Sequence, residues 1–243
     1  ATLVYTNAVF TGKLESDTLS VTATGTFEDK NVGTDKTVNI TGLPLGGASA
    51  GNYILAAEGQ QSTTTATISP RPVTVTIDAK SSAYGAAIAE LTATDDGIVD
   101  GDTDVYALAT SATSSSPVGS YDITGTSNSG NYDFTFTGGT NAYTITAASL
   151  SPSVTLDGWT YGDTPKGPVV TGNTENGEVT YLYKVWSASD ETYSPTVPTE
   201  AGKYSVKATI AATTNYQQDV VYDDFTIVPK VLTVTGLTAT DRV

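Results

Sequence analysis

The sequence contains no cysteine, no histidine and no methionine. Without cysteine, neither a disulfide framework nor a thiolate metal site is available. Without histidine, the commonest general base and metal ligand is missing, which excludes the usual serine–histidine triad. Only 11 residues are basic against 26 acidic ones, and the formal net charge is −15. So few cations cannot follow a phosphate backbone, and we expect no nucleic-acid binding.

Long apolar runs are also missing. No stretch approaches the roughly 18 apolar residues of a membrane-spanning helix, so we expect no membrane insertion. The chain starts with neither Met nor a signal-like segment, and we expect it to be an internal piece of a longer protein. Thr, Val, Gly and Ser are abundant, and 14 Tyr stand against 5 Phe and 2 Trp. Such a composition predicts an all-β protein.

One pattern occurs three times, at residues 32–53, 118–132 and 201–216. Each copy has a glycine before an alternating run and ends in an Asn-Tyr pair, after which a closing strand follows. The glycine suits a turn, asparagine tolerates left-handed backbone, and tyrosine suits the start of a half-buried strand. Three copies in one order indicate an internal repeat.

The repeats predict three small antiparallel β-sandwich or Ig-like modules, at residues 1–70, 71–147 and 148–230, which form an elongated rod. The prolines of residues 70–72 stiffen the first joint, because each removes a backbone donor and restricts its predecessor to extended backbone. Residues 231–243 alternate again and are predicted to be the opening strand of a further, truncated repeat.

The first module has no such opening strand and is therefore expected to expose an unpaired sheet edge. We expect residues 231–243 to be disordered or to add to the first module of a neighbouring molecule. Such a head-to-tail strand exchange would produce a filament rather than a ring.

Two groups of motifs resemble known families. Residues 26–33, 41–43 and 50–53 resemble the YDG repeats of bacterial surface proteins, although the Tyr-Asp-Gly signature itself is absent. The other group is similar to the mostly-beta, glycine-rich (MBG) repeats and comprises residues 83–85, 100–103, 118–121 and 130–132.

The third module is similar to the Ig-like modules that accompany such repeats. The resemblance implies tandem β modules in secreted or wall-anchored bacterial proteins, usually in adhesin-like stalks. It brings no catalytic residues.

The densest acidic run contains Asp95, Asp96, Asp100, Asp102 and Asp104. Calcium prefers several carboxylate or carbonyl oxygens that converge from a flexible loop, so these residues are a candidate calcium site. The run does not fit the helix–loop–helix calcium pattern, and Asp and Gly are also ordinary turn residues. Both interpretations stay open, and no other cofactor is expected.

Aromatic residues gather in the third module. Trp186, Tyr193 and Trp159 are candidates for a glycan-binding surface, although a small sandwich also needs its tryptophans in the core. For catalysis, the paired carboxylates Glu175 and Glu178 lie in a turn-rich loop where solvated charge is the simpler interpretation. We therefore expect no enzyme activity.

The predicted function is structural: a spacer segment of a secreted or wall-anchored bacterial adhesin, located outside the cell and in contact with the adjacent repeats. The alternative is an adhesin module in the third repeat that binds a glycan or a host protein.

Overall fold

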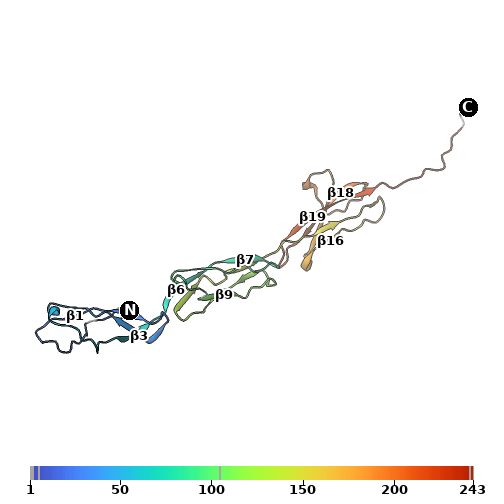
Figure 1. Ribbon diagram of the computed structural model, residues 1–243. Coiled ribbons are helices and arrows are strands. Elements are labelled where there is room, and N and C mark those ends of the chain that lie inside the picture. The colour runs from blue at the N-terminus through green and yellow to red at the C-terminus, as the bar shows by residue number, and fades with distance from the viewer. Residues whose placement is uncertain (1–2, 5, 104, 241, 243) are drawn as a thin grey trace. The chain divides into compact units, whose positions relative to one another are not determined.

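The computed structural model describes residues 3–4, 6–103, 105–240 and 242, and strands are the main regular structure (Figure 1). β-Branched and aromatic residues, which favour extended backbone, dominate these strands. The helical segments are single 3-10 turns at Ala50–Asn52, Thr174–Asn176 and Asp190–Thr192. Within the described residues, no helical segment is long and apolar enough to cross a bilayer. The predicted all-β class is confirmed.

The chain forms two compact units. The division crosses the second predicted module, whose strands fall in both units. Unit 1 comprises Ala1–Asp78, Thr92–Ala109 and Thr124–Gly139, and unit 2 comprises Ala79–Leu91, Thr110–Ile123 and Thr140–Val243.

The N-terminal part of unit 1 is an antiparallel sheet of order β2-β3-β5 beside the short pair β1–β4. Val38 is fully buried, and an added Cβ at Gly25 would lie 2.9 Å from the side chains of Val38 and Leu3. Leu3 and Val4 lie outside any strand. The strands are β1 (Ser20–Val21), β2 (Thr24–Phe27), β3 (Gly33–Thr41), β4 (Leu45–Gly46) and β5 (Thr63–Ile68).

The rest of unit 1 is built on β6 (Arg71–Ile77), which lies between β12 (Tyr132–Thr137) and β8 (Ala93–Asp95). Its alternating side chains Val73, Val75 and Ile77 are buried, as their spacing predicts. The remaining pair, β9 (Tyr106–Thr110) and β11 (Ile123–Ser127), has most of its residues in this unit.

The sequence predicts antiparallel pairing throughout, but β6 pairs with β12 in parallel. In unit 2, β7 (Lys80–Ala83) likewise pairs with β13 (Tyr143–Thr146) in parallel. More than 40 residues separate the partners in each pair, enough for the crossover connection that parallel strands need. The alternation of side chains specifies a strand's buried face but not the direction of its partner, so the sequence pattern did not distinguish these cases.

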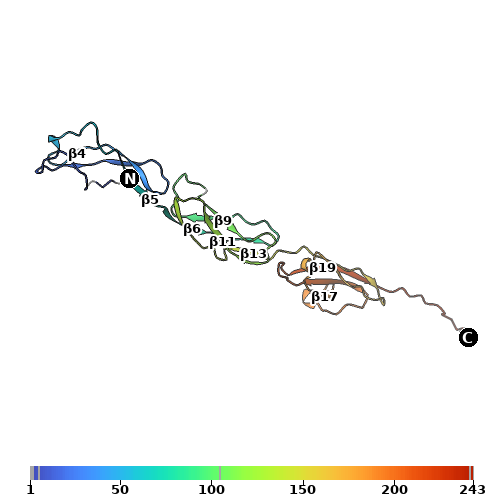
Figure 2. The ribbon, with the colours of Figure 1, turned by 90° about the horizontal axis from the view of Figure 1, so that it is seen from below.

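Unit 2 contains a four-stranded sheet of order β15-β19-β18-β17. Its strands β17 and β19 are labelled in Figure 2. Trp159 stacks on Phe225 with 5.2 Å between ring centroids, and both are buried in the core of this sheet. The strands are β10 (Gly119–Tyr121), which pairs with β13, and β14 (Ser153–Thr155), β15 (Trp159–Thr160), β16 (Val169–Thr171), β17 (Val179–Val185), β18 (Gly202–Ile210) and β19 (Asp219–Val228).

Strand β17 has apolar side chains on both faces, which predicts a central strand or one shielded by a loop. It lies at the edge of its sheet, and the segment after it folds back on it. Tyr183 and Ser194 exchange backbone hydrogen bonds of 2.7 and 2.9 Å, so the loop between them shields the strand.

The segment after β19 extends away from the sheet in both views (Figures 1 and 2). Val231, Leu232, Val234 and Leu237 are between 73% and 90% exposed, and residues 231–240 form no strand. These apolar side chains therefore have nothing to pack on among the described residues.

Gly158 tests the packing of unit 2. A Cβ added there would lie 2.1 Å from the Thr226 carbonyl oxygen of β19, a backbone atom that cannot rotate away. We expect Gly158→Ala to lower the free energy of unfolding by about 1–3 kcal/mol, measured by denaturant titration. Gly167→Ala, at a position with open space around it, is the matched control and should have no such effect. Equal stability of the two variants would contradict this packing.

Candidate functional site: two asparagine-centred joints

The aspartates of the predicted calcium site do not converge. Asp95 caps its own turn by accepting backbone hydrogen bonds, and Asp96 accepts one from the Thr74 N–H at 2.7 Å. Asp100 is exposed, and Asp104 lies outside the described residues. Across the part of the chain that the structure describes, no group of three or more acidic residues is placed to hold a metal ion. The described geometry therefore supports the turn interpretation.

The three aromatic candidates for glycan binding do not share one surface. Trp159 is 7% exposed in the core, where its ring cannot stack on a sugar. Trp186 is 51% exposed, and the ammonium of Lys203 lies 3.9 Å from its ring centroid. Tyr193 is half-buried against Tyr222. Trp186 is therefore the exposed ring of the three.

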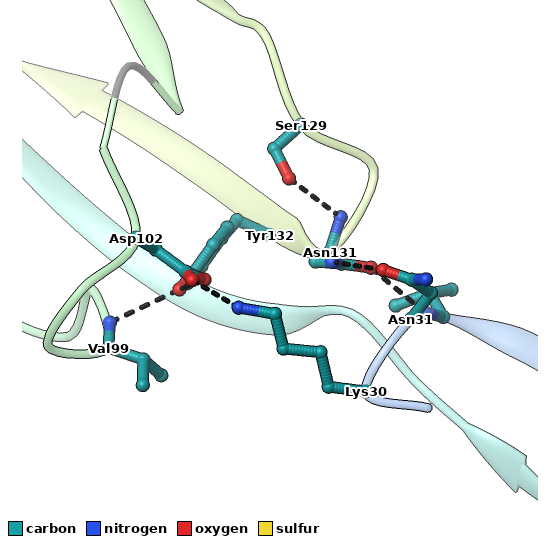
Figure 3. Close-up of polar contacts among 8 residues, drawn as sticks. Lys30, Asn31, Val99, Asp102, Ser129, Asn131 and Tyr132 are labelled. Atoms are coloured by element: carbon teal, nitrogen blue, oxygen red, sulfur yellow. Dashed lines mark hydrogen bonds and ion pairs between the residues drawn. The ribbon is translucent and has the colours of Figure 1, made fainter. Parts of the chain in front are cut away.

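The structure does bring together residues of the first and second predicted modules, around Asn131 in unit 1 (Figure 3). The Val32 N–H donates to Asn131 Oδ1 at 2.9 Å, and Asn131 Nδ2 donates to Asn31 Oδ1 at 3.1 Å. The backbone carbonyl of the same asparagine accepts from the Arg71 N–H at 2.9 Å. One residue thus binds both the turn before β3 and the start of β6. We call this arrangement the first joint.

The same arrangement recurs in unit 2 around Asn215, and we call it the second joint. The Val118 N–H donates to Asn215 Oδ1 at 3.0 Å, and the Ala148 N–H donates to the Asn215 backbone carbonyl at 2.9 Å. Asn215 Nδ2 donates to Glu175 Oε1 at 2.7 Å. The acceptor for the side-chain nitrogen thus differs between the joints, whereas the two backbone donors occupy corresponding positions.

Asparagine suits this position because its short side chain carries both an acceptor and two donors. A backbone N–H must face the oxygen, and a carboxylate or amide oxygen must face the nitrogen, so the partners fix the orientation of each amide. An aspartate in place of either asparagine would put a second oxygen against the acceptor, which is Asn31 Oδ1 in the first joint and Glu175 in the second. Alanine would leave the valine N–H without its partner, at a cost of about 1–3 kcal/mol where that group is buried.

A tyrosine and an aspartate reinforce the first joint (Figure 3). The Tyr132 hydroxyl donates to Asp102 Oδ2 at 2.7 Å and accepts from the Val99 N–H at 3.1 Å. Lys30, which belongs to the first predicted module, forms an ion pair with the same carboxylate. Asp102, a candidate calcium ligand in the sequence, thus links residues on both sides of the joint.

The same tyrosine–aspartate pair occurs near the N-terminus. The Tyr53 hydroxyl donates to the Asp17 carboxylate and accepts from the Leu14 N–H at 3.1 Å. In both copies the aspartate N–H closes a turn onto the carbonyl three residues earlier, at 3.0 Å. The Asn-Tyr motif therefore carries the same local structure in the first two predicted modules.

Two carboxylates of the joints have lowered pKa values. The hydrogen bond from Lys30, followed by the one from Tyr132, holds the pKa of Asp102 below its ordinary value of 3.8. The hydrogen bond from the Asn215 side chain, followed by the one from the Thr213 hydroxyl, holds the pKa of Glu175 below 4.5. Both groups are therefore ionised, and able to accept these bonds, at neutral pH.

Sequence reasoning identified Asn131 and Asn215 as turn residues but did not predict their contacts. The separation in sequence between each valine and its asparagine contains a signal. Val32 and Asn131 are 99 residues apart, and Val118 and Asn215 are 97 apart. The nearly equal separations show that both contacts join the same two motifs of successive copies, so the repeat predicts the second contact once the first is known.

Removing the Asn131 side chain tests the first joint. In Asn131→Ala the Val32 N–H loses its acceptor, and we expect its hydrogen exchange to become about tenfold faster, the equivalent of about 1.4 kcal/mol. NMR-detected amide exchange measures the rate. Asn39→Ala, which changes an exposed asparagine of β3, should leave it unchanged. An unaltered Val32 rate in Asn131→Ala would contradict the contact.

Acid should loosen the second joint. Because the pKa of Glu175 is lowered in the folded state, its contribution to stability is present above about pH 4.5 and is lost as the pH falls through the lowered value. We expect the Asn215 side-chain amide and Val118 N–H resonances to shift together below pH 4.5. Glu175→Gln should remove that transition, whereas its persistence in this variant would assign it to another group.

Two segments of the chain match family models. Residues 1–66 match the model of the YDG domain, and residues 73–144 match that of the MBG domain (YGX type). No curated protein matches the chain. Both kinds of domain are typical of repeats in bacterial surface proteins. The motif-based prediction is confirmed: residues 1–66 are a YDG domain, residues 73–144 are an MBG domain, and the first joint connects the two.

Proposed function

We propose that this chain is a structural spacer segment of a secreted or wall-anchored bacterial adhesin, in which asparagine-centred joints hold successive modules in a fixed orientation. The two family matches support a place in a surface protein. The recurrence of one hydrogen-bond arrangement at two joints carries the mechanical part of the proposal.

The linker lengths support stiffness at the first joint. Strand β5 ends at Ile68 and β6 begins at Arg71, so two residues connect them, and one of these is Pro70. A linker of two residues with a proline cannot act as a flexible tether. The Asn131 hydrogen bonds then fix the rotation that remains about this connection.

The surface chemistry supports a spacer more than a binding module. The net charge of −15 comes from only 15% charged residues, and the remaining surface is rich in Thr and Ser. A moderately acidic surface keeps neighbouring chains soluble and apart through like-charge repulsion. Of the three glycan candidates, only Trp186 is well exposed.

A spacer of this kind should be elongated in solution. A compact particle of this length would have a radius of gyration of about 18 Å. We expect small-angle X-ray scattering to give a value above about 30 Å, as three small modules in a row require. A value close to about 18 Å would contradict the spacer function.

The joints can be tested in the same experiment. The double variant Asn131→Ala, Asn215→Ala should retain the folded modules but broaden the distribution of interatomic distances, because the modules then reorient. Asn39→Ala is again the control. An identical distance distribution in the double variant would show that the joints do not fix the orientation of the modules. The linkers alone would then have to keep the modules in a row.

A further inference from the structure

Each joint has a donor half and an acceptor half. The donor half is the residue before the repeat's glycine together with a second backbone donor just after the closing strand, at Arg71 in the first joint and Ala148 in the second. The acceptor half is the asparagine of the Asn-Tyr pair in the next copy of the repeat. The two joints use two donor halves and two acceptor halves, but the sequence contains three copies of the repeat. One donor half, at Ala201 and Lys230, and one acceptor half, at Asn52, have no counterpart in the two joints.

Strand pairing places Ala201 and Lys230 in positions equivalent to those of the used donors. In each copy the glycine pairs with an isoleucine of the closing strand: Gly33 with Ile68, Gly119 with Ile145, and Gly202 with Ile227. The link donor follows that isoleucine by three residues in both joints, at Arg71 and Ala148. The same count in the third copy gives Lys230.

The turn before Ala201 is closed by the same kind of hydrogen bond as the turn before Val118. The Tyr121 hydroxyl donates to the Pro117 carbonyl at 2.7 Å, and the Tyr204 hydroxyl donates to the Glu200 carbonyl at 3.0 Å. In each case the tyrosine closes the turn four residues before it. Yet the N–H groups of Ala201 and Lys230 make no hydrogen bond within the described part of the chain, and both residues are exposed.

The unused acceptor half is equally well formed. Asn52 is exposed, and its side chain makes no hydrogen bond to the described residues, whereas Asn131 and Asn215 are half-buried in their joints. Tyr53 and Asp17 already have the arrangement that Tyr132 and Asp102 have in the first joint.

Neighbouring segments show what the missing partner would supply. Tyr132 begins β12, which pairs with β6, but the residues after Tyr53 form no strand, and Ile54 is 95% exposed. Conversely, the segment after Lys230 has the alternation of β6. Its Leu232 and Val234 occupy the positions of the buried Val73 and Val75, counted from Lys230 and Arg71. An unpaired strand-like segment thus exists at each side of the unused joint.

We propose that the third donor half binds the acceptor half of a YDG domain such as the one in a second copy of this chain. The Ala201 N–H donates to Asn52 Oδ1 of that copy, and the Lys230 N–H donates to its Asn52 backbone carbonyl. The segment 231–235 then pairs in parallel with the residues after Tyr53 and buries Leu232 and Val234. This inference rests on the proposed spacer function, and it names the partner of the unused donor and acceptor halves.

Two further positions set the chemistry of this third joint. Glu200 precedes Ala201 as Asn31 precedes Val32, so its carboxylate is placed to accept from Asn52 Nδ2, in the role of Asn31 Oδ1. Thr199 stands at the position of Lys30, so the third joint has no ion pair corresponding to Lys30–Asp102. The third joint should therefore be weaker than the first and is best tested within one covalent chain.

The experiment joins two full chains through a bridge of about four Gly and Ser residues. Asn52 of the second copy then follows Ala201 by about 98 positions, as the separations of 97 and 99 in the existing joints require. Segmental isotope labelling confines the NMR signals to the first copy. We expect the Ala201 and Lys230 amides of that copy to exchange at least about tenfold more slowly than in the single chain.

Asn52→Ala in the second copy should abolish the protection of the Ala201 amide, whose acceptor is the Asn52 side chain, and Asn7→Ala, at another exposed asparagine of the same YDG domain, should not. Exchange of Ala201 as fast as in the single chain, or protection of Ala201 that persists in Asn52→Ala, would overturn the third joint.

The Val32 and Val118 amides in the same spectra separate this inference from the proposed function. If they are protected while Ala201 is not, the third joint is wrong and the spacer function keeps its support. If all three exchange freely, both proposals fail.

Discussion

At each joint, the side-chain carbonyl of an asparagine accepts a hydrogen bond from the backbone of the preceding module, and this bond fixes how the two modules meet. A single hydrogen bond contributes about 1 kcal/mol, less than twice the thermal energy, and would be broken for a substantial part of the time. Asn131 combines such a bond with one from its side-chain nitrogen and one to its backbone carbonyl. Three bonds acting together contribute roughly 3 kcal/mol. The population of joints with these bonds broken is then about 1% or below.

The contacts described at the joints are mainly hydrogen bonds to backbone groups. A small β module has little hydrophobic surface to spare, because its buried residues are already used in its own core. Directional hydrogen bonds to backbone fix an orientation without a large apolar interface. They also depend on backbone groups more than on neighbouring side chains, so the second joint keeps the arrangement although Glu175 replaces Asn31 as acceptor.

The carboxylates of the joints show how the acidic composition is used locally. Asp102 holds a tyrosine hydroxyl and a lysine from opposite sides of the first joint, and Glu175 holds the amide of Asn215. Since both are ionised at neutral pH, the joints should be firm under ordinary conditions and loosen in acid.

The sequence predicted the repeat, the β class and the buried face of β6, because each depends on local spacing. It did not predict the parallel pairing of β6 with β12, since alternation of side chains does not depend on the partner's direction. Asp102 had two open interpretations, a candidate calcium ligand or a turn residue, because its neighbours in the sequence are acidic, whereas its partners Lys30 and Tyr132 lie 72 and 30 residues away. Trp159 was a surface candidate by residue type, and tertiary packing against Phe225 places it in the core.

We propose that Asn131 fixes the orientation of the YDG domain relative to the MBG strands that follow it within unit 1. Residual dipolar couplings of β3 and β5 on one side, and of β6 and β12 on the other, test this most directly. One alignment tensor should fit all four strands in the native chain, whereas two should be needed in Asn131→Ala. A native chain that already requires two tensors would contradict the account.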